Sequence, residues 1–502
     1  MLIYCTTISG TTLGVDGRLI RVEVDISDGL PAVNMVGMLS SEVKEAGERV
    51  RTALKNTGFS IPPKRITVNL SPADIKKQGT SYDLPIAAAI LASLGSFPRE
   101  RIENILIMGE LGLNGTIRPV KGILPVILEA KQMGITTCIL PLENVEEGSM
   151  VEGVTIVGAE TLEKLCEYLK TGELPMMTGE KKEEITVTQS RVDFSEVNGQ
   201  ELLRRASEIA AAGMHNLLMV GPPGSGKTMV ARRISTILPL LDEEESMELT
   251  KIYSASGLLV HKGIIRERPF RAPHHSASAA ALIGGGSIPK AGEVTLATHG
   301  VLFLDELPEF SRSSLEAMRQ PLEDRAVVIS RAKAVYRFPA DFMLVAAMNP
   351  CKCGYYPDRE RCSCSEVDVQ NYQGRVSRPF LDRMDLLVRT SQVKYEQLDK
   401  KCRNEDSKTI RGRVEQAQEI QKKRYQGENI RYNSQLSAGQ INRFCVPDRA
   451  GKKLLEEAYA GMNLTGRGYF RILKVARTIA DLDGSEQIKK KHISEAICLR
   501  QR

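Results

Sequence analysis

The stretch that decides the fold is LLMVGPPGSGKT, residues 217–228. Its first four residues are apolar enough for a buried parallel strand, and the remainder has the pattern of a phosphate-binding loop that opens a helix. Glycines in such a loop let backbone N–H groups close around the β-phosphate of ATP. Lys227 would reach the β- and γ-phosphates, and the Thr228 hydroxyl would ligate Mg²⁺. The expected ATP-binding residues are Gly221, Pro222, Pro223, Gly224, Ser225, Gly226, Lys227 and Thr228.

Two further apolar strands are expected to end beside this loop. Residues 301–304, VLFL, lead into Asp305 and Glu306, and a later apolar run leads into Asn349. Asp305 can hold the Mg²⁺ shell, and Glu306 can polarise the water that attacks the γ-phosphate. Asn349 can contact that phosphate or the water. The structural alternatives are acids that cap the next helix and an asparagine that forms a turn before Pro350.

Strand and helix patterns divide the 502 residues into three domains and a linker. Residues 1–170 mix both patterns and predict an α+β domain, and the polar residues 171–190 predict a linker. In residues 191–392 strands alternate with helices, which predicts a doubly wound parallel α/β sheet. Residues 393–502 carry only helical patterns and predict a helical lid.

The composition is that of an ordinary folded protein. Hydrophobic residues make up 42% and charged residues 26%, which excludes a disordered or collagen-like chain. The net charge of +6 permits a polyanionic partner without establishing one. The amino terminus lacks the pattern of a signal peptide, and no apolar run reaches the roughly 18 residues of a membrane span. We therefore expect a cytoplasmic protein with no membrane partner.

Four cysteines stand close together directly after Asn349. They lie within fourteen residues, as Cys351, Cys353, Cys362 and Cys364. Zinc binds four thiolates tetrahedrally, and a turn between the two pairs could bring them together, so a structural zinc site is expected. Free thiols or a redox disulfide are the alternatives.

Four motifs carry a resemblance to a known family. They are RPFRAPHHSASAAALIGGG at 268–286, PKAGEVTLATHGVLFLDELPEF at 289–310, AAMNPCKCGYY at 346–356 and RILKVARTIADL at 471–482. With them, the chain resembles AAA+ ATPases of the magnesium-chelatase-like branch, most closely the ComM/YifB family. The resemblance implies an ATP- and Mg²⁺-dependent ring motor that assembles as a homo-hexamer.

The resemblance also implies two catalytic arginines. Arg383, in SRPFLDRMD, matches the arginine finger that a neighbouring subunit inserts toward the γ-phosphate, and Arg467, in LTGRGYFR, matches the sensor 2 arginine of the lid. A guanidinium suits both roles because it neutralises charge on the transferred phosphoryl group. Surface ion pairs are the alternative, and Arg471 is a competing lid residue.

Residues 1–170 resemble the Lon-protease-like domain. The segment GTSYD at 79–83 matches the Lon segment with the nucleophilic Ser81, but the position of the Lon lysine falls on Leu124. A Ser–Lys protease needs that lysine close to the serine. The resemblance therefore implies a non-proteolytic domain that serves as a scaffold or a platform for DNA.

A basic segment follows at residues 323–338, EDRAVVISRAKAVYRF. Its period-two alternation puts Arg331, Lys333 and Arg337 on one face, and in this family such a segment resembles the hairpin that lines the ring pore. These side chains are candidate DNA contacts, with a solvated strand face as the alternative. His274 and His275 could also face the pore, or be buried or capping residues.

Two classes of function remain open. The first is an ATP-driven translocase or branch-migration helicase that acts on branched or single-stranded DNA in recombination or transformation. The second is a chelatase-type ATPase that remodels a protein partner. The Lon-like domain favours DNA, because the ATPase subunit of the chelatase lacks it.

Overall fold

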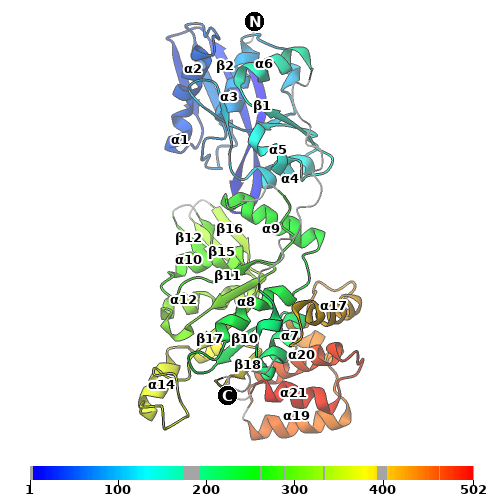
Figure 1. Ribbon diagram of the computed structural model, residues 1–502. Coiled ribbons are helices and arrows are strands. Elements are labelled where there is room, and N and C mark those ends of the chain that lie inside the picture. Colours follow the sequence, from blue (N-terminus) through cyan, green and yellow to red (C-terminus); the bar gives the residue numbers. More distant parts are fainter. Residues whose placement is uncertain are drawn as a thin grey trace. The chain divides into compact units, whose positions relative to one another are not determined.

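The computed structural model describes residues 4–173, 192–259, 263–286, 289–331, 334–392, 404–462 and 464–500 (Figure 1). The chain forms two compact units. The first is built on the amino-terminal region and includes segments 246–265 and 328–337, and the second contains the other segments that follow the expected linker. That linker, residues 171–190, lies mostly outside the described residues.

The first unit contains a seven-stranded mixed sheet in the order β3-β4-β2-β1-β5-β8-β9. Its strands are β1 (Tyr4–Leu13), β2 (Asp16–Ser27), β3 (Ala32–Val36), β4 (Arg65–Ser71), β5 (Leu106–Ile107), β8 (Thr137–Pro141) and β9 (Thr155–Ala159). The pairs β1–β2 and β2–β4 are antiparallel, and the other neighbours are parallel. The longer helices are α2 (Ala46–Asn56), α3 (Asp83–Ser93), α4 (Ile123–Gln132) and α6 (Leu162–Thr171). Every residue of α3 is buried, which explains its nearly continuous apolar sequence.

The second unit is built on a five-stranded sheet in the order β11-β14-β17-β10-β18. The strands are β10 (Leu217–Val220), β11 (Phe270–Arg271), β14 (Val301–Leu304), β17 (Met343–Met348) and β18 (Leu386–Arg389). All four pairings are parallel, so the carboxyl ends of the strands share one edge. Strand order reverses beside β10, and open α/β sheets bind ligands at such a point. The predicted parallel α/β core is confirmed.

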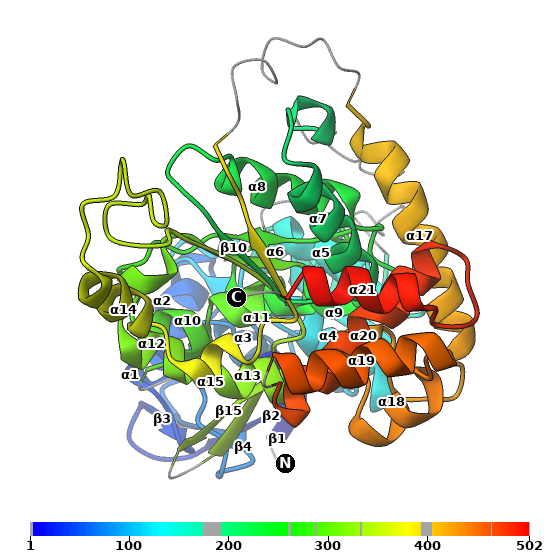
Figure 2. The ribbon, with the colours of Figure 1, turned by 90° about the horizontal axis from the view of Figure 1, so that it is seen from below.

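Helices complete the second unit. The helices α7 (Glu201–Gly213) and α8 (Lys227–Ile237) flank β10 in the chain, and the carboxyl-terminal helices are α17 (Ser407–Arg424), α18 (Ala438–Phe444), α19 (Arg449–Gly461), α20 (Gly466–Leu482) and α21 (Lys490–Cys498). Figure 2 shows α17, α20 and α21 near α7. The amide of Gln421 donates to the carbonyl of Ala212 at 2.8 Å, so the helical segment shares a buried core with the sheet.

Smaller elements complete the part of the chain that follows α8. They include α9 (Glu243–Ser256), α10 (Ala279–Ile283), α12 (Arg312–Ala317), α13 (Arg319–Asp324), the hairpin strands β15 (Ala326–Arg331) and β16 (Ala334–Pro339), α14 (Glu366–Gly374) and α15 (Arg378–Leu381). Among the described residues, the structure contains no helix that is both long and apolar enough to span a membrane.

Candidate nucleotide site

The expected phosphate-binding residues lie where β10 ends and α8 begins. Gly224 and Gly226 have φ angles of +74° and +81°, which favour glycine. The Nζ of Lys227 donates to the carbonyl oxygens of Gly221 at 2.7 Å and Pro222 at 2.9 Å. Burial lowers the pKa of Lys227, and the charge of Asp305 opposes this shift. The lysine head group thus lies inside the loop, where a phosphate oxygen could replace the carbonyl partners.

Side chains that follow three parallel strands in the chain meet at this loop. The Thr228 hydroxyl donates to Oδ2 of Asp305 at 2.7 Å, and Nζ of Lys227 lies 3.3 Å from Oδ1 of Asn349. The strands place them there because β10 and β14 both pair with β17 in parallel register. A hydroxyl and a carboxylate oxygen at hydrogen-bond distance can both ligate one Mg²⁺ ion.

Glu306 follows Asp305 in an unusual backbone conformation. Its φ angle is +52°, in the left-handed region that non-glycine residues rarely adopt, and such outliers gather at functional sites. Oε2 of Glu306 lies 3.1 Å from Nδ1 of His275. The Glu306 side chain is 59% exposed, so water can reach it.

His275 is a site residue whose place the sequence left open between the pore and a structural role. It follows β11 by four residues, at the same edge of the sheet as Glu306. Its ring also lies 4.0 Å from the ring of His274, measured between centroids. The signal that could have located it is its position just after a strand, because parallel strands end at a common edge.

The two expected arginines lie away from the phosphate-binding loop of their own subunit. Arg383 precedes the amino end of β18, whereas the loop follows the carboxyl end of the parallel strand β10. Arg383 donates to the carbonyl of Pro379 and to Glu323, and Nη2 of Arg467 lies 3.9 Å from Glu323. The structure therefore brings Arg383 and Arg467 together, but not to Lys227.

The surroundings of Arg383 are rich in guanidinium groups. Burial lowers the pKa of Arg383, Glu323 raises it, and the nearby charges of Arg319, Arg467 and Arg471 lower it further. Within the described part of the chain, buried N–H groups of Arg319, Arg383 and Arg471 have no hydrogen-bond partner. Buried donors are normally paired, so this cluster can accept an additional anion.

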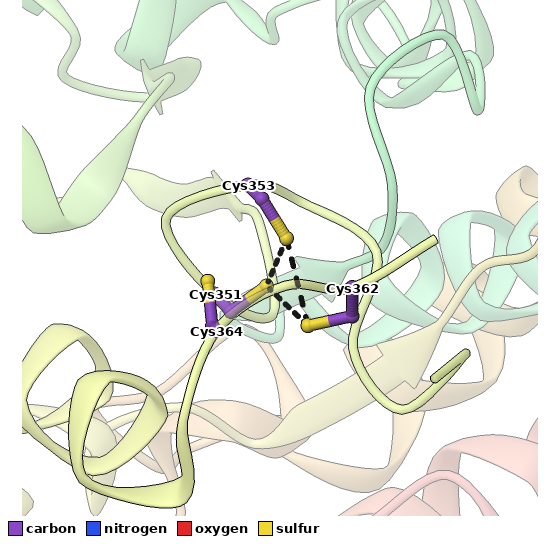
Figure 3. Close-up of side chains that lie close together, drawn as sticks. All are labelled: Cys351, Cys353, Cys362 and Cys364. Carbon is purple, nitrogen blue, oxygen red and sulfur yellow. Dashed lines mark hydrogen bonds between the residues drawn. The ribbon is translucent and has the colours of Figure 1, made fainter. Parts of the chain in front are cut away.

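The four cysteine side chains converge, as Figure 3 shows. The Sγ atoms of Cys351, Cys353 and Cys362 are 3.3, 3.5 and 3.7 Å apart, and the four Sγ atoms, with that of Cys364, all lie within 4.8 Å of one another. Tetrahedral thiolates around zinc are about 3.8 Å apart. The donor set and its spacing therefore fit Zn²⁺.

The cysteine loop packs directly on the phosphate-binding loop. Gly354 has a φ angle of +90°, and a Cβ atom added there would lie 2.5 Å from Cδ of Pro223. A cavity of about 320 Å³ lies beside this contact, lined by residues of both loops, including Gly221, Pro222 and Tyr355. The cysteine loop thus packs against one side of the phosphate-binding loop.

The basic hairpin is present as β15 and β16. Arg331 and Arg337 are both exposed, whereas Lys333 lies outside the described residues. At the base of the hairpin, Nε of Arg325 lies 3.3 Å from Oδ1 of Asp341, and the backbone N–H of Ala340 donates to the carbonyl of Arg325 at 2.9 Å. The base of the hairpin is therefore held by both an ion pair and a backbone bond.

A glycine-rich loop beside a hydroxyl and a carboxylate that could ligate Mg²⁺, with a further exposed carboxylate, is characteristic of P-loop ATPases. Family models agree: "Magnesium chelatase, subunit ChlI" matches residues 193–398, "Subunit ChlI of Mg-chelatase" matches 22–144, and "Magnesium chelatase, subunit ChlI C-terminal" matches 404–500. The chain is therefore a magnesium-chelatase-like AAA+ ATPase.

Full-length relatives define the family more closely. The chain is 42% identical to competence protein ComM of Haemophilus influenzae, over 98% of this chain and 96% of that protein. It is 41% identical to YifB of Escherichia coli, over 97% and 95% of the two chains. The chain belongs to the ComM/YifB family, and the predicted family is confirmed.

The amino-terminal region is similar to Lon proteases. Lon protease 2 of Bacillus subtilis is 27% identical over 30% of this chain and 30% of that protein. The predicted Lon-like fold is thus confirmed. At the position expected for the catalytic lysine, Leu124 is buried in α4, among apolar side chains.

The contact between Gly354 and Pro223 generates a first prediction. Gly354→Ala should weaken ATP binding about tenfold, because left-handed strain of about 1–3 kcal/mol adds to a steric clash against the phosphate-binding loop. Gly374→Ala is the matched control, since nothing lies within 4 Å of the added Cβ. Titration with a fluorescent ATP analogue would measure both. Equal ATP affinity in the two variants would contradict a role of this contact in nucleotide binding.

Proposed function

We propose that this chain forms a homo-hexameric ring that hydrolyses ATP to move along DNA, as a translocase or branch-migration helicase. The observation that carries the proposal is the convergence of Lys227, Thr228, Asp305 and Asn349 at one edge of the sheet. The proposed roles follow the domains expected from the sequence: a non-proteolytic platform at 1–170, a motor core at 191–392 and a lid at 393–502.

In the proposed hydrolytic step, the loop of residues 221–228 holds the triphosphate and Lys227 contacts its β- and γ-phosphates. Thr228 and Asp305 would hold Mg²⁺, which supplies charge neutralisation at the phosphate oxygens. Glu306 polarises the attacking water, and Asn349 orients the water or the γ-phosphate. The exposure of Glu306 and its position next to Asp305 support this division of roles.

We propose that Arg383 and Arg467 act together on the nucleotide of a neighbouring subunit. Arg383 lies at the amino end of β18, whereas the phosphate-binding loop lies at the carboxyl end of the parallel strand β10, and this separation supports action across a subunit boundary. Arg383 and Arg467 both contact Glu323, which supports action of both arginines on the same nucleotide. The unpaired buried N–H groups of the cluster favour an anion such as a phosphate. Arg471 has a different partner, because its Nε lies 3.4 Å from Asp385.

The shared site predicts complementation between defective subunits. Arg383→Ala subunits keep an intact phosphate-binding loop, whereas Lys227→Ala subunits keep the arginine. Each alone should hydrolyse ATP poorly, and mixtures should regain activity at the interfaces that unite an intact loop with an intact arginine. Steady-state ATPase rates across mixing ratios would measure this. No recovery in rings shown to mix would contradict action in trans.

We propose a structural zinc ion at Cys351, Cys353, Cys362 and Cys364. The close approach of the four sulfurs supports a metal, and the packing of this loop on Pro223 gives the metal a structural purpose. Freshly purified, reduced protein should contain about one zinc per chain. Replacing Cys351 and Cys362 by Ser should release zinc and lower the melting temperature. If mass spectrometry detects no zinc in this protein, the four cysteines are free thiols and the proposed zinc site is wrong.

The choice of DNA as substrate is supported by a relative and by charge. The relative at 42% identity carries the name competence protein ComM, and the exposed Arg331 and Arg337 give the hairpin the basic character that a phosphate backbone requires. Branched or single-stranded DNA is the proposed form. The second candidate, remodelling of a protein partner, is favoured by the magnesium-chelatase family models.

A salt series separates these candidates. Replacing Arg331 and Arg337 by Glu should weaken DNA binding for all sequences alike and flatten its salt dependence, because fewer counterions are released. ATP turnover without DNA should be unchanged, since neither residue belongs to the nucleotide site. Affinity for forked DNA at several salt concentrations would be measured. The double variant Lys408→Glu and Lys422→Glu, at two exposed residues of α17, is the charge-matched control. If the wild-type protein forms rings but these rings bind no DNA, the result would favour an ATPase that remodels a protein partner.

A further inference from the structure

Glu323 connects the two arginines that the proposed function assigns to the subunit interface. Arg383 and Arg467 approach the same oxygen, Oε1 of Glu323. The two guanidiniums differ in exposure, because the Arg383 side chain is 6% exposed and that of Arg467 is 63% exposed. One carboxylate thus neutralises a withdrawn arginine and an accessible one together.

In this conformation Arg383 is held by partners within its own subunit. Its Nη1 donates to the carbonyl of Pro379 at 2.5 Å, and its Nη2 donates to Glu323. An arginine that neutralises a phosphate on another subunit must leave these partners. A γ-phosphate and the Glu323 carboxylate are both oxyanions, so they compete for the same guanidinium fork.

We propose that Glu323 is a positioning residue that restrains Arg383, and with it Arg467, until the nucleotide of the neighbouring subunit displaces the carboxylate. The inference rests on the proposed shared site. Two other carboxylates of this region contact other arginines: Glu316 pairs with Arg319 at 2.6 Å, and Asp385 pairs with Arg471. Glu323 is therefore the carboxylate that sets the availability of the finger arginine.

Glu323 also lies next to the basic hairpin in the chain. It belongs to α13, which ends at Asp324, and β15 begins at Ala326. The intervening Arg325 is fixed by its ion pair with Asp341 and by a left-handed φ angle of +51°. Asp324 and Arg325 alone separate Glu323 from the hairpin in the chain, so DNA contact at the hairpin is the trigger that we propose for release of Arg383.

The isosteric substitution Glu323→Gln tests the restraint. It removes the charge and keeps the shape, so turnover without DNA should rise about three- to fivefold, the range for a partly exposed ion pair, while KM for ATP stays within about twofold. Stimulation by DNA should shrink accordingly. Glu323→Asp, which keeps the charge, should restore most of the wild-type behaviour. Asp324→Asn is the matched control, because this exposed neighbour in α13 pairs with neither arginine.

Mixed rings locate the effect. Subunits with both Glu323→Gln and Glu306→Gln cannot hydrolyse ATP themselves but would supply an unrestrained arginine. Mixed with wild-type subunits, they should raise turnover per wild-type subunit above that in mixtures with Glu306→Gln alone. Unchanged or lower turnover in the Glu323→Gln protein, or a rise that does not pass to the neighbour, would overturn the inference. Failed complementation by Arg383→Ala would instead reject the shared site itself.

Discussion

The parallel pairing of β10 and β14 with β17 is the constraint on which the nucleotide site depends. It aligns the carboxyl ends of three short strands, so that Lys227, Asp305 and Asn349 reach one point although they are far apart in sequence. This strand pairing brings the Thr228 hydroxyl within 2.7 Å of Asp305. A slip of one residue in this register would separate these groups and turn their side chains to the opposite face of the sheet.

The opposite edge of the same sheet has its own polar network. Asp385, before β18, accepts the backbone N–H of Asn216, before β10, at 2.9 Å, and Arg471 of α20 lies beside it. Burial disfavours ionisation of Asp385, but His215, Arg471 and Lys474 together hold its pKa well below the usual range. This network holds helix α20 close to Asp385, two residues after Arg383. In our proposal one sheet thus serves two nucleotides, its own at the carboxyl edge and its neighbour's through the amino edge.

The sequence predicted the motifs that lie within one short segment, but it predicted few of the contacts between residues that are far apart in the chain. The phosphate-binding loop, the strand before Asp305 and the cysteine cluster were recognisable because each lies in one short segment. His275 lies 31 residues from its partner Glu306, and Glu323 lies 60 residues from its partner Arg383. The position of His275 just after a strand was an available signal, whereas no sequence pattern indicates that Glu323 contacts Arg383. Strand β1 lacked a clear signal because its alternation includes many small polar residues, and pairing with β2 stabilises it.

The central claim is that the site is completed by Arg383 of an adjacent subunit. Glu306→Gln should bind ATP and Mg²⁺ without turnover, because its water lacks the polarising carboxylate. An electron-microscopy reconstruction of this variant with ATP would show directly which groups contact the γ-phosphate. We expect a closed ring in which Arg383 of one subunit contacts the γ-phosphate held by Lys227 of the next, and has left Glu323. Nucleotide-filled subunits in which Arg383 still contacts its own Glu323, with no neighbour at the γ-phosphate, would contradict the account.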